Sequence, residues 1–208
     1  MQDIQNFWSL QFAEHAFFIQ DGIDVTKDPS LKQEAINQYT KWQQYLTNPT
    51  EDFNALMSEL LNLKQKILNI ISSGGNIGSI YPAELEHMIM ELKFVQKQLN
   101  SNVSEQEEID FWIQENSQHT GAAAHYLDPL EKNLTDKNLE MSDLIENTSD
   151  DQVMDIIEES NKSALNLNKL VKSNKVLTIN NPVTSMKLEH EIREAQLGQQ
   201  RLSMLLSM

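Results

Sequence analysis

The stretch Phe7-Trp8-Ser9-Leu10-Gln11-Phe12-Ala13-Glu14-His15 returns in the second half of the chain as Phe111-Trp112-Ile113-Gln114-Glu115-Asn116-Ser117-Gln118-His119. The Phe-Trp pair and the histidine keep their register in both copies. A second element, Leu85-Glu86-His87 followed by Glu91, returns at nearly the same offset as Leu188-Glu189-His190 followed by Glu194. Two independent echoes indicate an internal duplication, and repeats are the first feature to seek in a sequence.

The duplication predicts two similar halves, residues 1–103 and residues 104–208. A chain of this length can form one large domain or two small ones, and either can bury a sizeable core. We expect each half to be a four-helix repeat. We also expect the two repeats to pack together around a site shared across a pseudo-two-fold axis.

Apolar residues recur at helical spacing along the whole chain, beginning with residues 3–20, where His15 lies on the same stripe as Phe12 and Ile19. A flexible loop is expected at residues 72–78, and a short, irregular helix at residues 136–146. No strand is predicted, so the fold class is all-α, an internally duplicated bundle of four plus four helices with antiparallel neighbours. Helix start signals are Asp28-Pro29, Thr50, Tyr81-Pro82, and Ser104 with Glu107 three residues later.

Composition excludes several classes of function. The net charge is −15 and the pI is about 4.6, which disfavours binding to nucleic acid and to anionic membrane surfaces. Cysteine is absent, so disulfides, thiolate metal sites and cysteine nucleophiles are excluded. No signal peptide or membrane-spanning stretch is found, and a cytoplasmic protein is therefore expected.

Four of the five histidines occupy echoed positions. His87 and Glu91 are four residues apart, so on a helix they project from one face, and His190 and Glu194 repeat this spacing. Imidazoles together with carboxylates suit a first-row transition metal, and the carboxylates favour iron or manganese. The expected metal is iron, with manganese and zinc as alternatives. The predicted metal ligands are His15, His87, Glu91, His119, His190 and Glu194.

A structural interpretation competes with the metal-site interpretation. A single buried histidine is more often a hydrogen-bonded core residue than a ligand, and a His-x-x-x-Glu pair on a helix is often a surface pair. The duplication favours ligands, because the polar residues persist while their neighbours change. His125 has no echo and is left out. The membership of six further glutamates stays open, namely Glu14, Glu59, Glu86, Glu115, Glu159 and Glu189.

The two Phe-Trp elements and the two Leu-Glu-His elements resemble a duplicated domain family of unknown function from spore-forming bacteria, whose members are similar to ferritin-like or hemerythrin-like helical proteins. The resemblance covers both halves and implies helical bundles with an internal metal site of His and Glu, with iron as the implied metal. The chain departs from the Glu-x-x-His signature of di-iron bundles. Glu84 fits that spacing before His87, but Lys187 stands at the matching position before His190.

Two hypotheses of different classes follow. The first is a mononuclear or dinuclear metal-binding protein, for which iron or manganese storage, redox sensing and an oxidase-type reaction all stay open. The second is a metal-free acidic scaffold or homodimer that uses the methionine-rich tail, residues 202–208. Hydrolase motifs are absent: the chain has no nucleophile elbow, no phosphate-binding glycine loop and no His-Glu-x-x-His helix.

Overall fold

The computed structural model describes residues 2–148, 150–179 and 181–206. In these ranges the chain is all-helical and contains no strand, which confirms the predicted all-α fold class. No helix in these ranges carries an apolar stretch long enough to cross a membrane. The helices are α1 (Gln2–Gly22), α2 (Pro29–Thr47), α3 (Phe53–Ser72), α4 (Pro82–Leu99), α5 (Glu105–His125), α6 (Lys132–Asn147), α7 (Asp150–Lys172) and α8 (Asn181–Leu205).

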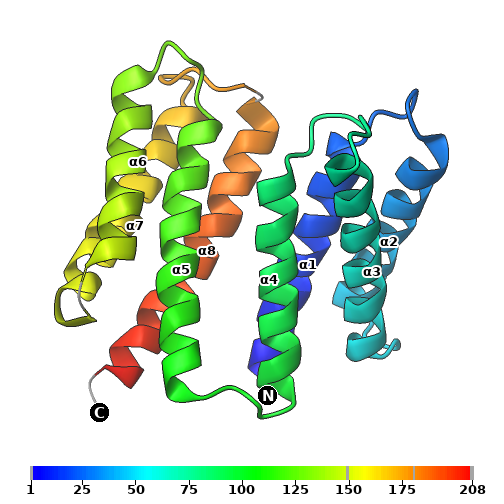
Figure 1. The fold of residues 1–208 in the computed structure, drawn as a ribbon, viewed down its shortest axis with the longest axis horizontal. Coiled ribbons are helices and arrows are strands. Elements are labelled where there is room, and N and C mark those ends of the chain that lie inside the picture. Colours follow the sequence, from blue (N-terminus) through cyan, green and yellow to red (C-terminus); the bar gives the residue numbers. More distant parts are fainter. Residues whose placement is uncertain (1, 149, 180, 207–208) are drawn as a thin grey trace. The chain divides into compact units, whose positions relative to one another are not determined.

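The chain divides into two compact units, Met1–Val103 and Ser104–Met208. In the first unit, α1 packs along α2 and α3 packs along α4 (Figure 1). In the second unit, α5 packs against both α6 and α8, and α7 packs along α8. Each unit is thus a bundle of four helices joined by short connections, as expected for antiparallel neighbours.

The two units differ in the filling of their interiors. In the first unit, Phe12 lies among aromatic rings, with centroid distances of 5.5 Å to Trp42 and 6.2 Å to Phe53. Such edge and offset contacts add to the apolar burial that holds a bundle together. In the second unit, the counterpart of Phe12 is the buried Asn116, and that of Ala16 is the buried Thr120. The second interior is therefore more polar at this level.

The glycine-rich loop before α4 is fixed by backbone pairing. Asp24 N donates to Ile77 O at 2.7 Å, and Ser79 N donates to Gly22 O at 2.9 Å. Gly78 between them has a φ of 147°, and a Cβ there would lie only 2.0 Å from Gly22 O. Only glycine fits this close approach. These two hydrogen bonds and the burial of Ile77 hold in place the loop that the sequence predicts to be flexible.

The second unit repeats this closure. Asp128 N donates to Leu177 O at 3.0 Å, and Ile179 N donates to Tyr126 O at 3.1 Å. The helices α3 and α7 also end alike. Gly75 N bonds Ile70 O and Lys175 N bonds Leu170 O, each after a residue in the left-handed region. These matched contacts make α3 and α7 equivalent helices of the two repeats, so each residue of α3 has a counterpart in α7.

Two details of the helix boundaries differ from the sequence prediction. Thr50 does not cap α3; the cap is Asp52, whose carboxylate accepts from Asn54 N. Asp52 immediately precedes Phe53, the first residue of α3, so its carboxylate is placed to accept from the free backbone amides of the first turn. The sixth helix is longer than the predicted 136–146, since α6 runs from Lys132 to Asn147. Part of the predicted loops and tail, Ser149, Asn180 and residues 207–208, lies outside the described residues.

Candidate metal centre

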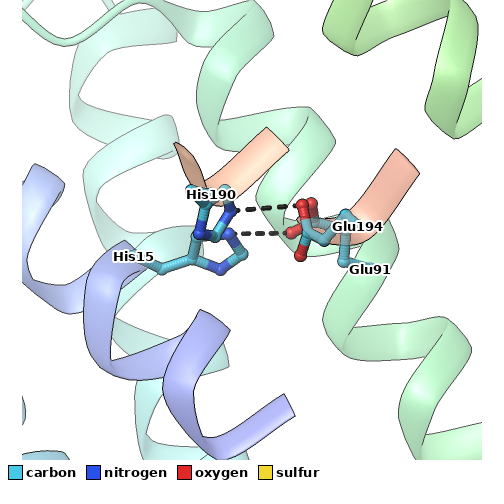
Figure 2. A group of neighbouring side chains, drawn as sticks. All are labelled: His15, Glu91, His190 and Glu194. Carbon is cyan, nitrogen blue, oxygen red and sulfur yellow. Dashed lines mark ion pairs between the residues drawn. The ribbon is translucent and has the colours of Figure 1, made fainter. Parts of the chain in front are cut away.

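The first unit gathers three of the predicted ligands. His15 follows the buried Trp8 and Phe12 on the inner face of α1, and it is itself buried. Its Nε2 lies 3.1 Å from Oε2 of Glu91 on α4, the contact marked by a dashed line in Figure 2. His87, one turn before Glu91, places its Nε2 2.9 Å from the other carboxylate oxygen. Glu91 is fully buried, so two imidazoles from two helices serve one interior carboxylate.

Lys64 of α3 is a further charged group in this interior, and it is fully buried. Its Nζ lies 3.0 Å from Nδ1 of His15 and donates to Met88 O at 2.9 Å. An ammonium can only donate, so His15 accepts on Nδ1 and carries its proton on Nε2, facing Glu91. A metal ion at Nε2 would have to displace this proton, and metal binding to the first unit is therefore coupled to proton release.

The second unit gathers the three matching ligands and one more carboxylate. His119 Nε2 on α5 lies 3.2 Å from Oε2 of Glu194 on α8, and His190 Nε2 lies 3.2 Å from the same oxygen. Figure 2 shows the imidazole of His190 directed at Glu194. His119 Nε2 also lies 3.2 Å from Oε1 of Glu115, one turn earlier on α5. All four side chains are buried.

Electrostatics distinguish the two carboxylates on neighbouring turns of α8. Burial alone would raise the pKa of Glu194, but the nearby His190 and His119 outweigh it and hold this pKa well below the usual value. Burial raises the pKa of Glu191, and His119 together with the Tyr126 hydroxyl only partly offsets it. Glu194 is thus held in the ionised form that a metal ligand must have.

The ligand atoms in each unit have separations that suit a metal. Two atoms bound about 2.1 Å from one ion lie roughly 3.0–3.4 Å apart at octahedral or tetrahedral angles. The distances from histidine nitrogen to glutamate oxygen are 2.9 and 3.1 Å in the first unit and 3.2 Å for all three pairs in the second. The chain thus contains groups of His and Glu side chains, buried except for the half-buried His87, that could hold a metal ion.

The charge balance of the second interior also favours a cation. Its buried glutamates include Glu115, Glu191 and Glu194, whereas the described part of this unit contains no buried lysine or arginine. Arg201 is only partly buried and pairs with Glu108, 2.6 Å away. Buried carboxylates are costly unless a positive charge or several hydrogen bonds compensate them. A bound cation would supply that charge.

Four of the glutamates left open by the sequence lie outside the clusters. Glu59 bonds Gln38 and Lys41 and ties α3 to α2, away from the histidines. Glu189 pairs with Lys172 at the surface. Glu86 and Glu159 are exposed, and so is His125. These residues belong to the helix surfaces and not to either cluster.

Two residues of the clusters were missed or set aside by sequence reasoning. Glu115 was left open by the sequence, and its counterpart Gln11 cannot serve as an anionic ligand, yet both are fully buried. Lys64 gave no signal, because its counterpart is Ala164 and a lone lysine in a helical pattern reads as surface. Comparing the two halves identifies only residues that both halves share. It therefore missed Lys64 and Glu115, each of which occurs in one half alone.

Comparisons with known proteins identify a similar sequence and a similar fold. No protein-family model matches the chain. It is 27% identical over 160 residues to an uncharacterized protein of Acanthamoeba polyphaga mimivirus, a match that covers 64% of this chain. The chain spans about half the length of that relative, since the match covers 49% of it.

The fold is that of a solved structure, the crystal structure of an uncharacterized protein from Bacillus cereus G9241. The two superpose with a TM-score of 0.84 at 16% sequence identity, covering 98% of this chain and 90% of the other. At this identity the likeness concerns the fold alone. The chain therefore shares its all-helical architecture with a bacterial protein and part of its sequence with a viral one.

Proposed function

We propose that this protein is a metal-binding, ferritin-like helical protein whose metal is iron or manganese. The observation that carries the proposal is that Glu91 and Glu194 are each fully buried and each contacted by two histidines from two different helices. The ligands are His15, His87 and Glu91 in the first unit and His119, His190 and Glu194 in the second, with Glu115 added to the second set.

The donor chemistry supports this choice of metal. Neutral imidazoles bind zinc, copper, iron and nickel, and each carboxylate added to them shifts the preference toward harder ions such as iron and manganese. The second set has two histidines and two glutamates, an even balance of nitrogen and oxygen donors. When bound, such a metal supplies Lewis-acid or one-electron chemistry. The chain's own residues bury Glu194 and lower its pKa.

Metal analysis of protein purified without a histidine tag tests the proposal. We expect iron or manganese in the wild-type protein, and its loss in a double variant Glu91→Gln with Glu194→Gln. Glutamine keeps the size of each side chain but removes the anionic oxygen that binds the metal. The matched controls are Glu86→Gln and Glu159→Gln, which alter exposed glutamates on α4 and α7 and should keep the full metal content.

The single variants test the prediction of one shared site. If each unit binds its own ion, Glu91→Gln and Glu194→Gln should each remove about half of the metal. If the six ligands serve one centre, each single variant should remove nearly all of it. Metal that is absent after reconstitution with iron(II), manganese(II) and zinc(II), or that is retained by the double variant, contradicts the proposal.

A further inference from the structure

The metal ligands of the two units match, but their surroundings differ. We call His15, His87 and Glu91 the first cluster, and His119, His190 and Glu194 the second cluster. In each cluster two imidazoles from different helices contact one fully buried carboxylate. Two exchanges of buried residues beside these ligands make the clusters unequal in charge.

The first exchange places a cation beside the first cluster only. Lys64 is fully buried, and its Nζ lies 3.0 Å from Nδ1 of His15. The counterpart of Lys64 on α7 is Ala164, which lines a small cavity and carries no charge. A metal ion bound to His15 would share that imidazole with the ammonium of Lys64, and two positive charges in a buried interior repel each other strongly. Lys64 therefore weakens metal binding by the first cluster.

The second exchange adds an anion to the second cluster only. Glu115 on α5 is fully buried, and its Oε1 lies 3.2 Å from Nε2 of His119. The counterpart of Glu115 on α1 is Gln11, which is also fully buried. A carboxylate brings a negative charge together with its ligand oxygens, whereas the amide of glutamine is neutral. Glu115 therefore strengthens metal binding by the second cluster.

The two exchanges act in the same direction. With neutral histidines, the negative charge of Glu91 in the first cluster is balanced by the positive charge of Lys64 in the same interior. In the second cluster the charges of Glu115 and Glu194 add, and the described part of that unit contains no buried lysine or arginine. Buried charges require compensation. The chain itself supplies it in the first unit, whereas a divalent metal ion would supply it in the second.

The clusters also differ in their exposure to solvent. The side chain of His87 is 16% exposed, whereas that of its counterpart His190 is 5% exposed. The remaining ligands of both clusters are buried. His87 is therefore the ligand that solvent reaches most easily, and water or a chelator can compete there for a metal ion. This difference favours faster exchange of metal at the first cluster.

We propose that the two clusters are unequal metal sites: the second cluster retains its ion, and the first cluster binds an ion more weakly and exchanges it with solvent. Glu115 and Lys64 set the difference in affinity, and His87 sets the difference in exchange rate. This inference rests on the proposed metal-binding function and gives each unit its own part in it. The first cluster loads and releases iron or manganese, and the second cluster holds it.

Metal release from the full-length protein loaded with manganese(II) tests the inequality. An excess of a chromophoric chelator, whose absorbance reports the metal that it removes, should show two kinetic phases of equal amplitude. We expect their rates to differ by about tenfold or more, since groups around a metal site change its affinity by about 10–100-fold. Stepwise titration of the metal-depleted protein with manganese(II) should show two classes of binding that differ in affinity by a similar factor.

Two variants that copy a residue from the other unit assign the classes to the clusters. Glu115→Gln introduces the residue type of Gln11, and it should weaken the tight class by about tenfold. Lys64→Ala introduces the residue type of Ala164, and it should strengthen the weak class by about tenfold and slow its release. Lys66→Ala and Glu159→Gln, exposed changes on α3 and α7, are the matched controls and should leave both classes unchanged.

A single class of binding in the wild-type protein, or two classes of equal affinity and rate, would overturn the inference and leave the metal-binding proposal intact. An unchanged tight class in Glu115→Gln, or an unchanged weak class in Lys64→Ala, would also overturn it. Absence of any metal binding would instead contradict the proposed function, and the inference with it. The wild-type measurements decide between one class and two by themselves, so the test stands even if a variant fails to fold.

Discussion

Lys64 on α3 places its Nζ 3.0 Å from Nδ1 of His15 on α1, inside the first unit and shielded from solvent. The pair fixes the tautomer of the histidine, because the ammonium has no lone pair to accept a proton. A histidine that binds a metal through Nε2 usually donates its Nδ1–H to an acceptor. Lys64 offers the opposite polarity, so it disfavours the metal-bound form of His15.

The first prediction concerns this lysine. Lys64→Met keeps most of the side-chain volume and removes the cation, so the Nδ1–H tautomer of His15 becomes available. We expect the apparent affinity for iron(II) or manganese(II) to rise by about tenfold, the scale of outer-sphere effects on metal sites. Competition with a chromophoric chelator measures it. Lys66→Met, an exposed change two residues along α3, is the control. A fall in affinity would contradict this interpretation of the pair.

Metal removal should lower the thermal stability of the protein. A ligand present at 100 times its dissociation constant stabilises the folded state by about 2.7 kcal/mol. For a chain of this size that corresponds to a fall in Tm of roughly 5–10 °C upon chelation. Differential scanning calorimetry with and without chelator measures the shift, and adding metal back should reverse it. The double variant Glu91→Gln with Glu194→Gln should show no shift, and a shift there would indicate metal bound elsewhere.

The start of α3 provides a test of helix capping. Asp52 accepts a hydrogen bond from Asn54 N at 2.8 Å, whereas Thr50 lies outside the helix. We expect Asp52→Ala to lower the free energy of unfolding by about 1 kcal/mol, the usual value of a cap. Thr50→Ala should leave it nearly unchanged. Urea denaturation followed by circular dichroism measures both changes in the free energy of unfolding. A larger effect of the threonine variant would show that Thr50 caps α3, as the sequence predicts.

Close packing of α8 against α5 depends on one glycine. A Cβ at Gly198 would lie 2.7 Å from the ring of Trp112, which is buried. Gly198→Ala should therefore destabilise the protein by about 1–2 kcal/mol, with overpacking exceeding the gain in helix propensity. Gln196→Ala, on an exposed position of the same helix, is the matched control. Equal stability of the two variants in denaturant titrations would show that the ring can move aside.

The ion pair between α2 and α3 predicts a small pH dependence. Hydrogen bonds from Lys41 and Gln38 lower the pKa of Glu59 below its usual value of 4.5. The stabilisation is thus present above the unfolded pKa and is lost as the pH falls through the lower, folded pKa. The pair is partly exposed to solvent, so we expect about 0.5 kcal/mol. Comparing Glu59→Gln with wild type at pH 7 and pH 3 measures it; a difference that grows toward acid would reverse the sign.

The sequence predicted the all-helical fold because local signals sufficed. Apolar spacing, the Asp28-Pro29 start and the Ser104–Glu107 capping box each act within one or two turns, and the structure has helices with these starts. The errors were equally local. Thr50 and Asp52 are both residue types that cap helices well, and only the path of the chain entering α3 decides which of them caps it.

The duplication took the prediction further than local signals could. It selected four histidines and two glutamates from a chain rich in acidic residues, and these are the side chains that meet inside each unit. A repeat compares one chain with itself, so it highlights what both halves retain. It is blind to Lys64 and Glu115, where the halves differ.

The sequence by itself determined the helices, the repeat and the identity of the histidines and glutamates. Tertiary structure alone decided which of these polar side chains are buried and which other side chains they contact. The fully buried Lys64 and the cavity beside Ala164 follow from how α3 and α7 pack in their own units. The physical reason is that burial and charge balance are set by side chains on other helices, which the local pattern around a residue does not contain.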